Sequence, residues 1–184
     1  MTTHDKIKKI IKHFLTIILV FSLVILSTPA FATPVDESRL IQLTNQERME
    51  NGLKPLSFDY SLYFAAKNKA DDMIKNNYFE HYSPDGKSPW NFIHNAGYNY
   101  SVAGENLAMD FRTSEGTNKA WMNSPTHKDN ILDENYEDIA IAVVTGDFNG
   151  HETTMVVEMF GKKQKNTNPF SSLFNKITSF IFGI

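Results

Sequence analysis

The chain has 184 residues, of which 41% are hydrophobic, and its formal net charge at neutral pH is −3. That length suits one domain with a single sizeable core, and the acidic balance argues against a binder of nucleic acid. The chain contains no cysteine. The sequence therefore excludes a small secreted scaffold held by disulfide bonds and any mechanism with a cysteine nucleophile.

Residues 1–32 have the pattern of a secretory signal peptide. Four lysines precede an apolar run from Phe14 to Leu26, and the run leads to the small-residue sequence Ala30-Phe-Ala32. We expect cleavage after Ala32, in a bacterial protein that is secreted, extracellular or attached to the cell envelope. The alternative is an uncleaved membrane anchor, but the apolar run is shorter than the roughly 20 residues that a membrane-spanning helix needs.

The first half of the remaining chain is predicted to be mainly helical. Helices are predicted over residues 36–51, 59–77, 88–97 and 113–123. Each begins near a residue that caps helices well, such as Asp59 or Ser61 in the second helix. This second helix also carries an apolar stripe at the 3.6-residue spacing of a core-facing helix. The stripe consists of Leu62, Ala65, Ala66, Ala70, Met73 and Ile74.

The second half is predicted to be rich in strands, over residues 101–109, 139–144 and 153–160. The last two strands are separated by a short turn sequence that indicates a hairpin, and the apolar character of residues 139–144 indicates a central strand. Because Pro125 disfavours a helical residue before it, His127 is expected in a new short turn. Helices followed by strands with a short connection predict an α+β fold in which an antiparallel sheet packs against helices.

The composition changes after Gly161. Residues 162–168 are predicted to be a polar linker, and residues 169–184 carry apolar side chains at helical spacing. These side chains are Phe170, Leu173, Phe174, Ile177, Phe180 and Ile181. One interpretation is an amphipathic helix that lies on a membrane surface or on a partner. The other is that this tail folds back onto the domain or is a loose terminus, since Lys176 is the only cation on its polar face.

Two histidines and a glutamate are the strongest candidates for chemistry. His81, Glu105 and His127 each lie on or beside a predicted loop and are well separated along the chain. Two imidazoles and a carboxylate are ligands that a zinc ion or another divalent cation uses with an open coordination position. The same trio suits acid–base chemistry. The alternative is that these side chains only form the hydrogen bonds that hold the loops together.

Other polar and aromatic residues are secondary candidates. The sequence has no Gly-x-Ser-x-Gly, no His-Glu-x-x-His and no glycine-rich phosphate loop. Ser124 precedes a proline, which makes it first of all a turn residue. Trp90, Tyr98 and Trp121 are candidate cleft aromatics, with a core position as the alternative for Trp121. Glu158 lies in an apolar strand, where a carboxylate either is paired or faces water at a sheet edge, and we expect edge exposure.

Six short motifs, in this order, resemble the CAP superfamily, also called the SCP or SCP/TAPS domain, and in particular its bacterial exported branch. They are Leu43-Thr-Asn-Gln-Glu-Arg48, Gly52-Leu-Lys-Pro-Leu56, His81-Tyr-Ser-Pro-Asp-Gly86, Gly104-Glu-Asn106, Trp121-Met-Asn-Ser-Pro-Thr-His127 with Asn130-Ile-Leu132, and Glu158-Met-Phe-Gly161. Each motif alone is weak, but the six together are specific. We therefore assign residues 36–161 to such a domain.

The resemblance implies a three-layer α-β-α sandwich with a central antiparallel sheet, and a cleft that holds two histidines and acidic partners. By motif, His81 is the first cleft histidine, Glu105 the cleft glutamate and His127 the second histidine, with Asn106 as a ligand-binding candidate beside Glu105. Ser124 stands where animal and plant members carry a second glutamate. With one carboxylate fewer, a metal site here would carry less negative charge. The departure also argues against any mechanism that needs two glutamates.

Members of this superfamily share no single activity. The resemblance implies a binder of sterols, fatty acids or protein partners, and some members bind divalent cations. We expect a non-enzymatic exported module whose cleft binds a lipid, a peptide or a cell-envelope component. The alternative is a metal-dependent hydrolase of peptide or cell-wall bonds, with His81 and His127 as metal ligands and Glu105 as base or ligand. Binding is favoured because, with Ser124 in place of a glutamate, few groups remain to supply both a catalytic zinc site and a separate base.

Overall fold

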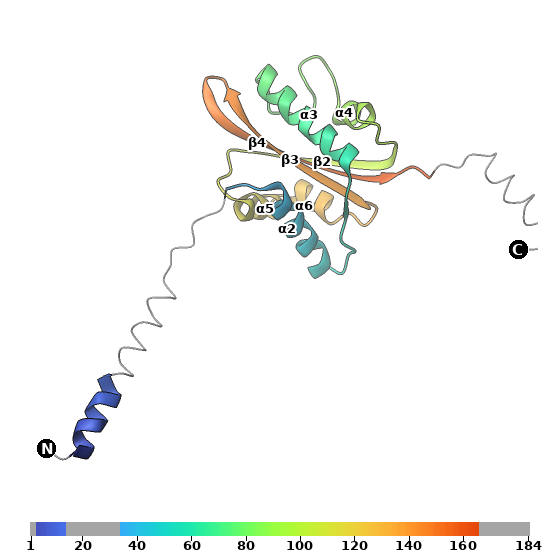
Figure 1. Ribbon diagram of the computed structural model, residues 1–184. Coiled ribbons are helices and arrows are strands. Elements are labelled where there is room, and N and C mark those ends of the chain that lie inside the picture. The colour runs from blue at the N-terminus through green and yellow to red at the C-terminus, as the bar shows by residue number, and fades with distance from the viewer. Residues whose placement is uncertain (1–2, 14–33, 166–184) are drawn as a thin grey trace, which may run out of the picture. The chain divides into compact units, whose positions relative to one another are not determined.

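The computed structural model of the protein describes residues 3–13 and 34–165 (Figure 1). Residues 3–13 form a helix in a unit separate from the domain. The apolar run and the expected cleavage position of the predicted signal peptide lie outside the described residues, as does the tail over residues 169–184. Within the described residues, no helix combines the length and the apolar character needed to cross a membrane.

A four-stranded sheet forms the middle layer of the domain, with the strand order β1-β3-β4-β2. The strands are β1 (Ser57–Phe58), β2 (Tyr100–Met109), β3 (Asp138–Phe148) and β4 (His151–Lys163). Both β2 and β3 pair antiparallel with β4, whereas β1 pairs parallel with β3 over two residues. The predicted antiparallel pairing is thus confirmed for the three long strands. The short β1, which has too few residues to show an alternating pattern, makes the sheet mixed.

β3 and β4 are longer than predicted and form one hairpin. The turn consists of Asn149 and Gly150, whose φ angles are 52° and 83°. Positive φ at both central residues is typical of the two-residue hairpin turns that match the twist of the strands. At its other end β4 continues to Lys163, so the first two residues of the predicted linker over residues 162–168 belong to the strand.

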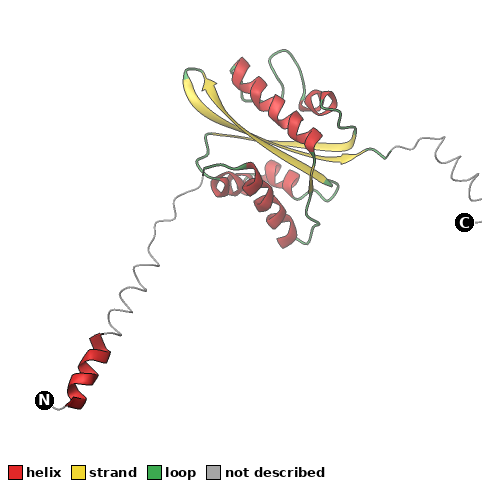
Figure 2. Ribbon diagram, in the orientation of Figure 1, coloured by secondary structure: helices red, strands yellow, loops and turns green. Residues whose placement is uncertain are grey.

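Helices cover both faces of the sheet (Figure 2). α3 (Tyr60–Asn76) and α4 (Pro89–Asn95) form one outer layer, which we call the α3 layer. α2 (Glu37–Glu50), α5 (Ser114–Asn123) and α6 (Pro125–Ile131) form the other, which we call the α2 layer. The predicted α+β fold, a three-layer α-β-α sandwich, is confirmed.

The helix boundaries follow from local chemistry. The side chains of Asp36, Asp59 and Thr113 each accept a hydrogen bond from a backbone N–H in the first turn of α2, α3 and α5. The four predicted helices are confirmed. The expected break before His127 is confirmed, because Ser124 is extended between α5 and α6, but the new element is a short helix rather than a turn, with His127 as the third residue of α6. Pro125 opens this helix at its first position, where a missing N–H breaks no hydrogen bond.

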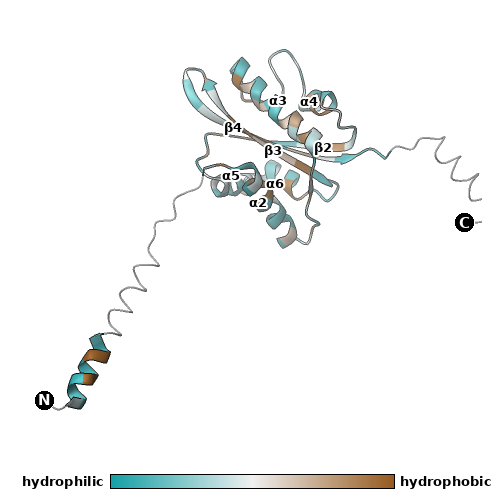
Figure 3. Ribbon diagram, viewed as in Figure 1, coloured by the Kyte–Doolittle hydropathy of each residue, from teal (hydrophilic) through white to brown (hydrophobic). Residues whose placement is uncertain are grey.

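Two apolar cores lie on the two faces of the sheet, and Figure 3 shows hydrophobic residues concentrated where β3 and β4 pass between the helices. The core of the α3 layer includes Leu62, Ala66, Met73, Ile93, Tyr98 and Met159. The core of the α2 layer includes Leu40, Trp121, Ile131, Ile139, Ile141 and Phe160. Burying one such large apolar side chain contributes roughly 1.5–3 kcal/mol. Successive side chains of β3 and β4 point alternately into the two cores, and a shift by one residue would exchange them, so this alternation fixes the register of the strands.

Candidate functional site

His81 and Glu105 form a hydrogen-bonded pair in the α3 layer. The side chain of Glu105, on β2, is 1% exposed, and that of His81, on the loop after α3, is 52% exposed. His81 Nδ1 lies 2.6 Å from Glu105 Oε1. Burial raises the pKa of Glu105, and the hydrogen bond with Glu105 raises the pKa of His81. The pair therefore keeps one shared proton to a higher pH than an isolated histidine would.

A buried lysine holds the loop that carries His81. Lys69, in the middle of α3, is fully buried. Its Nζ donates to the backbone oxygens of Glu80 and His81, both at 2.8 Å, and to the Tyr78 hydroxyl at 3.2 Å. Burial lowers the pKa of Lys69, and the charge of Glu105 opposes that shift. Lys69 thus fixes the backbone at His81 and places a positive charge near Glu105.

Glu158 is fully buried in the α2 layer, so the expected edge exposure is wrong. β4 lies between β3 and β2 in the sheet, and a residue of this strand cannot face water at an edge. Glu158 Oε1 accepts a hydrogen bond from Thr44 Oγ1 at 2.7 Å, and Oε2 accepts one from Asn106 Nδ2 at 2.9 Å. Burial raises the pKa of Glu158 to about 7.

Asn106 connects Glu158 to α6. Its Nδ2 also donates to the backbone oxygen of His127 at 3.2 Å, and its Oδ1 accepts from Asn130 Nδ2 at 2.9 Å. Asn130 Nδ2 donates in addition to the backbone oxygen of Glu105 at 3.0 Å. These bonds hold α6 against β2.

The backbone of β2 alternates between two sides. The N–H of Asp110, the residue after β2, donates to the oxygen of Thr154 in β4 at 2.9 Å. Successive residues of an antiparallel strand turn their backbone groups to opposite sides. The even-numbered residues of β2 from residue 102 onward therefore face β4, and the odd-numbered ones face away. Because β2 is the last strand of the sheet, the odd-numbered residues form an open edge.

Side chains cap this open edge along part of its length. Trp121 Nε1 donates to the backbone oxygen of Leu107, and Asn130 Nδ2 donates to that of Glu105, both at 3.0 Å. Ala103 is the next odd-numbered residue, and in residues 34–165 no side-chain hydrogen bond caps its backbone. The edge of β2 is therefore open to a partner at Ala103.

A hollow of about 360 Å³ lies at this open edge, and we call it the edge hollow. It is lined by residues from the α3 layer, from β2 and from α6. The lining residues are His81, Tyr82, Pro89, Trp90, Ala103, Gly104, Glu105 and Asn130. The edge hollow thus combines the histidine–glutamate pair, aromatic side chains and free strand backbone.

Two of the three predicted cleft aromatics are core residues. Tyr98 is 1% exposed, and its hydroxyl donates to Asp138 Oδ2 at 2.7 Å in the core of the α3 layer. Trp121 is 2% exposed in the opposite core. Trp90 is the member of the trio that lines the edge hollow. The spacing of residues in the sequence could not distinguish the two core aromatics from the one in the hollow, because both kinds lie on the apolar face of their helix or strand.

Ser124 and His127 are not among the residues that line the edge hollow. Ser124 is the N-cap residue of α6, and its Oγ lies 3.4 Å from Thr126 Oγ1. His127 is half-buried, and burial together with the positive charge of His81 lowers its pKa. The positive charge of His81 therefore disfavours a proton on His127, although the two residues belong to different layers.

The predicted metal site of His81, Glu105 and His127 is not assembled. In the parts of the chain that the structure describes, no three His, Asp or Glu side chains lie close enough together to hold a metal ion. Glu105 Oε1 is hydrogen-bonded to His81, and Glu105 Oε2 is buried without a hydrogen-bond partner among these residues. A zinc ion with an open position normally takes three protein ligands. The residues present do not fit such a site.

Sequence reasoning missed the two buried cations of the domain, Lys69 and Arg48. The position of Lys69 inside the apolar stripe of α3 was a signal, because a solvated lysine is not expected there. Arg48 donates to the backbone oxygens of Lys54, Ile131 and Asp133 at 2.8–3.0 Å. It also lines a second hollow of about 500 Å³, which shares no residue with the edge hollow. The role of Arg48 is to join α2 to the end of α6.

Comparison with known proteins gives matches over most of this domain. A family model described as CAP, the cysteine-rich secretory protein family, matches residues 41–160. The chain is 44% identical over 108 residues to the uncharacterised protein YkwD of Bacillus subtilis, a match that covers 59% of this chain and 42% of that protein. It is 29% identical over 107 residues to the uncharacterised membrane protein YlbC of the same bacterium, covering 58% and 31%. The match thus spans less than half the length of these curated relatives.

Solved structures show the same architecture. An extracellular protein containing an SCP domain from Bacillus anthracis is 25% identical with a TM-score of 0.59, and the match covers 69% of this chain and 40% of that one. An outer surface protein from Borrelia burgdorferi is 22% identical with a TM-score of 0.61, covering 73% and 100%. At this level of identity the second match shows the fold alone.

Proposed function

The chain belongs to the cysteine-rich secretory protein (CAP) family, and from this premise we propose that it is an exported binding module whose edge hollow receives an extended polypeptide segment. Family membership alone does not decide this, because one fold hosts many functions. The proposal rests on one observation, which is that the open edge of β2 at Ala103 forms part of the wall of the hollow.

An open strand edge is a partner for another extended strand. Its unpaired N–H and C=O groups offer hydrogen bonds to the main chain of a ligand, and nearby pockets then select side chains. On β2 the caps from Trp121 and Asn130 occupy the outward oxygens of Leu107 and Glu105. Pairing is therefore confined to the stretch around Ala103, which favours a short extended segment.

The side chains around the edge hollow suit a polypeptide better than a lipid. Tyr82 is 62% exposed, and with Trp90 it offers aromatic surface to ligand side chains. The rest of the lining combines the polar side chains of His81, Glu105 and Asn130 with Pro89, Ala103 and the backbone of Gly104. Glu105 Oε2 has no hydrogen-bond partner among the described residues, and a buried acceptor left unpaired costs about 1–3 kcal/mol. This oxygen is buried, so the group of the histidine–glutamate pair that a ligand can reach is the half-exposed imidazole of His81, which forms hydrogen bonds with a polypeptide but not with an acyl chain.

Export is supported by the signal-like pattern over residues 1–32 and by the solved relative from Bacillus anthracis, which is described as an extracellular protein. An exported module of this kind meets polypeptides of the cell envelope and its surroundings. No catalytic step is assigned, because His81, Glu105 and His127 do not form a three-ligand metal site.

The proposal is tested with the full chain and a display library of random twelve-residue peptides. Peptides selected on the wild type are then synthesised and titrated by calorimetry against the wild type and Ala103→Pro. Proline removes the outward N–H, and sheets tolerate proline where the N–H points away from the neighbouring strand. We expect the variant to bind about tenfold more weakly, which corresponds to a loss of about 1.4 kcal/mol.

Thr145→Pro provides a matched control on the opposite edge of the sheet. The N–H of Val143 donates to Glu37 Oε1 at 3.0 Å, so the odd-numbered residues of β3 also face away from β4. The control should bind the peptides as the wild type does. Unchanged binding in Ala103→Pro, or the same loss in both variants, would overturn recognition at β2. Saturable zinc binding that disappears in His81→Ala would instead establish a cation site.

A further inference from the structure

Four aromatic side chains gather on the surface where β1 leads into α3, and we call them the aromatic patch. Phe58, Tyr60 and Phe64 are 45%, 72% and 54% exposed, and Tyr63 is partly buried among them. The ring centroids of Phe58 and Tyr60 lie 5.0 Å apart, those of Phe58 and Tyr63 6.1 Å, and those of Tyr63 and Phe64 5.9 Å. The four rings thus form one continuous surface.

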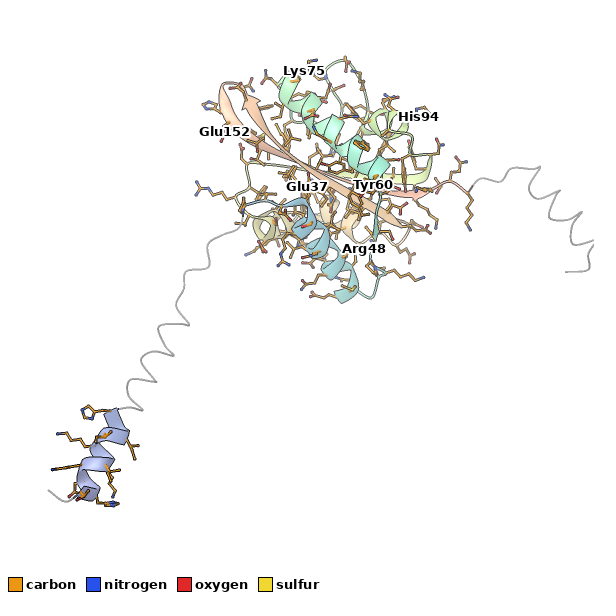
Figure 4. All side chains as sticks on the ribbon, viewed as in Figure 1. Glu37, Arg48, Tyr60, Lys75, His94 and Glu152 are labelled. Atoms are coloured by element: carbon orange, nitrogen blue, oxygen red, sulfur yellow. The ribbon has the colours of Figure 1, made fainter. Side chains whose placement is uncertain are left out.

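Continuity distinguishes this patch from ordinary exposed apolar residues. Single exposed apolar side chains are normal on a folded protein, but a contiguous patch marks a contact surface. Tyr60, labelled in Figure 4 at the start of α3, lies one turn before Phe64 on the same side of the helix. The patch is therefore built into a regular element and does not depend on a loop.

The end of β4 is held beside this patch. Asp59, which lies inside the run of residues 58–64 that forms the patch, pairs through its Oδ2 with Lys163 Nζ at 2.8 Å. The next residue, Gln164, donates its backbone N–H to the oxygen of Asn99 at 2.9 Å. The chain therefore leaves the sheet close to the aromatic patch.

The segment that follows carries side chains that suit such a surface. Residues 169–184 contain a single charged residue, Lys176, and apolar side chains at helical spacing, including three of the segment's four phenylalanines. Residues 166–168 separate this segment from the end of the described domain. An extended chain spans at most about 3.3–3.6 Å per residue, so Pro169 lies within about 15 Å of Lys165.

We propose that residues 169–184 pack their apolar positions against the aromatic patch of the same chain. A tether this short gives an effective concentration on the order of millimolar, which favours docking within one chain over a second copy at micromolar concentration. Phenylalanine rings of the tail then meet the exposed rings in offset or edge-to-face contacts.

The natural chain has no cysteine, so introduced cysteine pairs report this contact directly. The full chain carrying Phe64→Cys and Phe174→Cys is oxidised with glutathione at about 1 μM, and disulfide formation within the chain is followed by mass spectrometry. The matched control combines Phe174→Cys with Lys75→Cys, an exposed position at the other end of α3 (Figure 4). Both helix positions are exposed, and circular dichroism verifies that the variants fold.

We expect the Phe64 pair to close about tenfold faster than the Lys75 pair, with the same rate in the presence of phosphatidylglycerol vesicles. Equal rates for the two pairs would overturn the proposal, because the tail would then have no preferred site on α3. Disulfides that form between chains would assign the patch to a second copy. A rate for the Phe64 pair that falls to the control value when vesicles bind the chain would assign the tail to a membrane surface.

Discussion

Replacing the buried Glu158 by glutamine should make the stability of the domain less dependent on pH. The Glu158 side chain is fully buried and accepts hydrogen bonds from Thr44 and Asn106. Burial raises its pKa from 4.5 to about 7. Glutamine has nearly the same shape without the charge, and its amide can donate to the Thr44 hydroxyl while its oxygen accepts from Asn106. Glu158→Gln therefore keeps both contacts and removes the titration.

The sign of the effect follows from proton binding in the folded and unfolded states. Between pH 4.5 and 7, folded wild-type protein holds a proton on Glu158 that the unfolded chain has released. The free energy of unfolding therefore falls by about 1.4 kcal/mol per pH unit in this window, and by about 3 kcal/mol across it. The contribution is fully present below the unfolded pKa and is lost as the pH rises through the folded pKa. Glu158→Gln should match the wild type at the acidic end and exceed its stability by up to about 3 kcal/mol at pH 8.

Urea denaturation followed by circular dichroism at pH 5 and pH 8 measures this difference. Groups that titrate in both proteins, including the pair of His81 and Glu105, cancel in the comparison. Glu152→Gln, which replaces an exposed carboxylate of the same strand, is the matched control and should change the stability by less than about 0.5 kcal/mol at either pH. If the difference between the wild type and Glu158→Gln is the same at both pH values, the reasoning from burial is refuted.

Three further predictions concern the surroundings of the candidate site. Lys69→Met should lower the free energy of unfolding by about 2–4 kcal/mol because it leaves buried acceptors unpaired, whereas Lys67→Met on the exposed side of α3 should cost less than about 0.5 kcal/mol. Unfolding by guanidinium measures the free energy of unfolding of both variants, and an equal loss in the two would contradict the proposed role of Lys69 in holding the His81 loop. Glu105→Gln should lower the pKa of His81, since the carboxylate raises it, and an NMR titration with an unchanged midpoint would show that the pair does not form. Gly161→Ala should destabilise by about 1–3 kcal/mol because its Cβ would lie 2.5 Å from a ring carbon of the buried tyrosine beside it, and an unaltered Tm would contradict this packing.

Helices and long strands were predictable from sequence because their signals are local. Asp36, Asp59 and Thr113 each lie next to the helix that they cap, and the apolar stripe of α3 repeats within one element. β1 gave no such signal, since two residues cannot show a period. Its pairing with β3 depends on the tertiary fold, and so does the mixed character of the sheet.

The environment of Glu158 was not predictable, although its position was. A carboxylate in an apolar strand is visible in the sequence, but its partner Thr44 lies 114 residues away along the chain. The hairpin of β3 and β4 is also visible, whereas the addition of β2 on the far side of β4 is a long-range pairing. That pairing turns a strand that could have been an edge into a central one, and it buries Glu158.

The candidate site was predictable only in part for a similar reason. Residue types and family resemblance pointed to His81 and Glu105, and the structure places them 2.6 Å apart. Nothing in a side-chain pattern indicates Ala103, because its contribution is a backbone edge. The separation of His127 from the lining of the edge hollow depends on how α6 lies against β2, which local spacing does not encode.

The most direct test of binding at the edge of β2 is residue-resolved amide hydrogen exchange, measured by NMR on the full chain with and without a selected peptide. In the free chain the Ala103 amide should exchange faster than the Gly104 amide, which faces β4. Peptide binding is predicted to slow exchange at Ala103 by at least about tenfold while Gly104 stays unchanged. A peptide that binds while the Ala103 amide exchanges as fast as in the free chain would contradict the account.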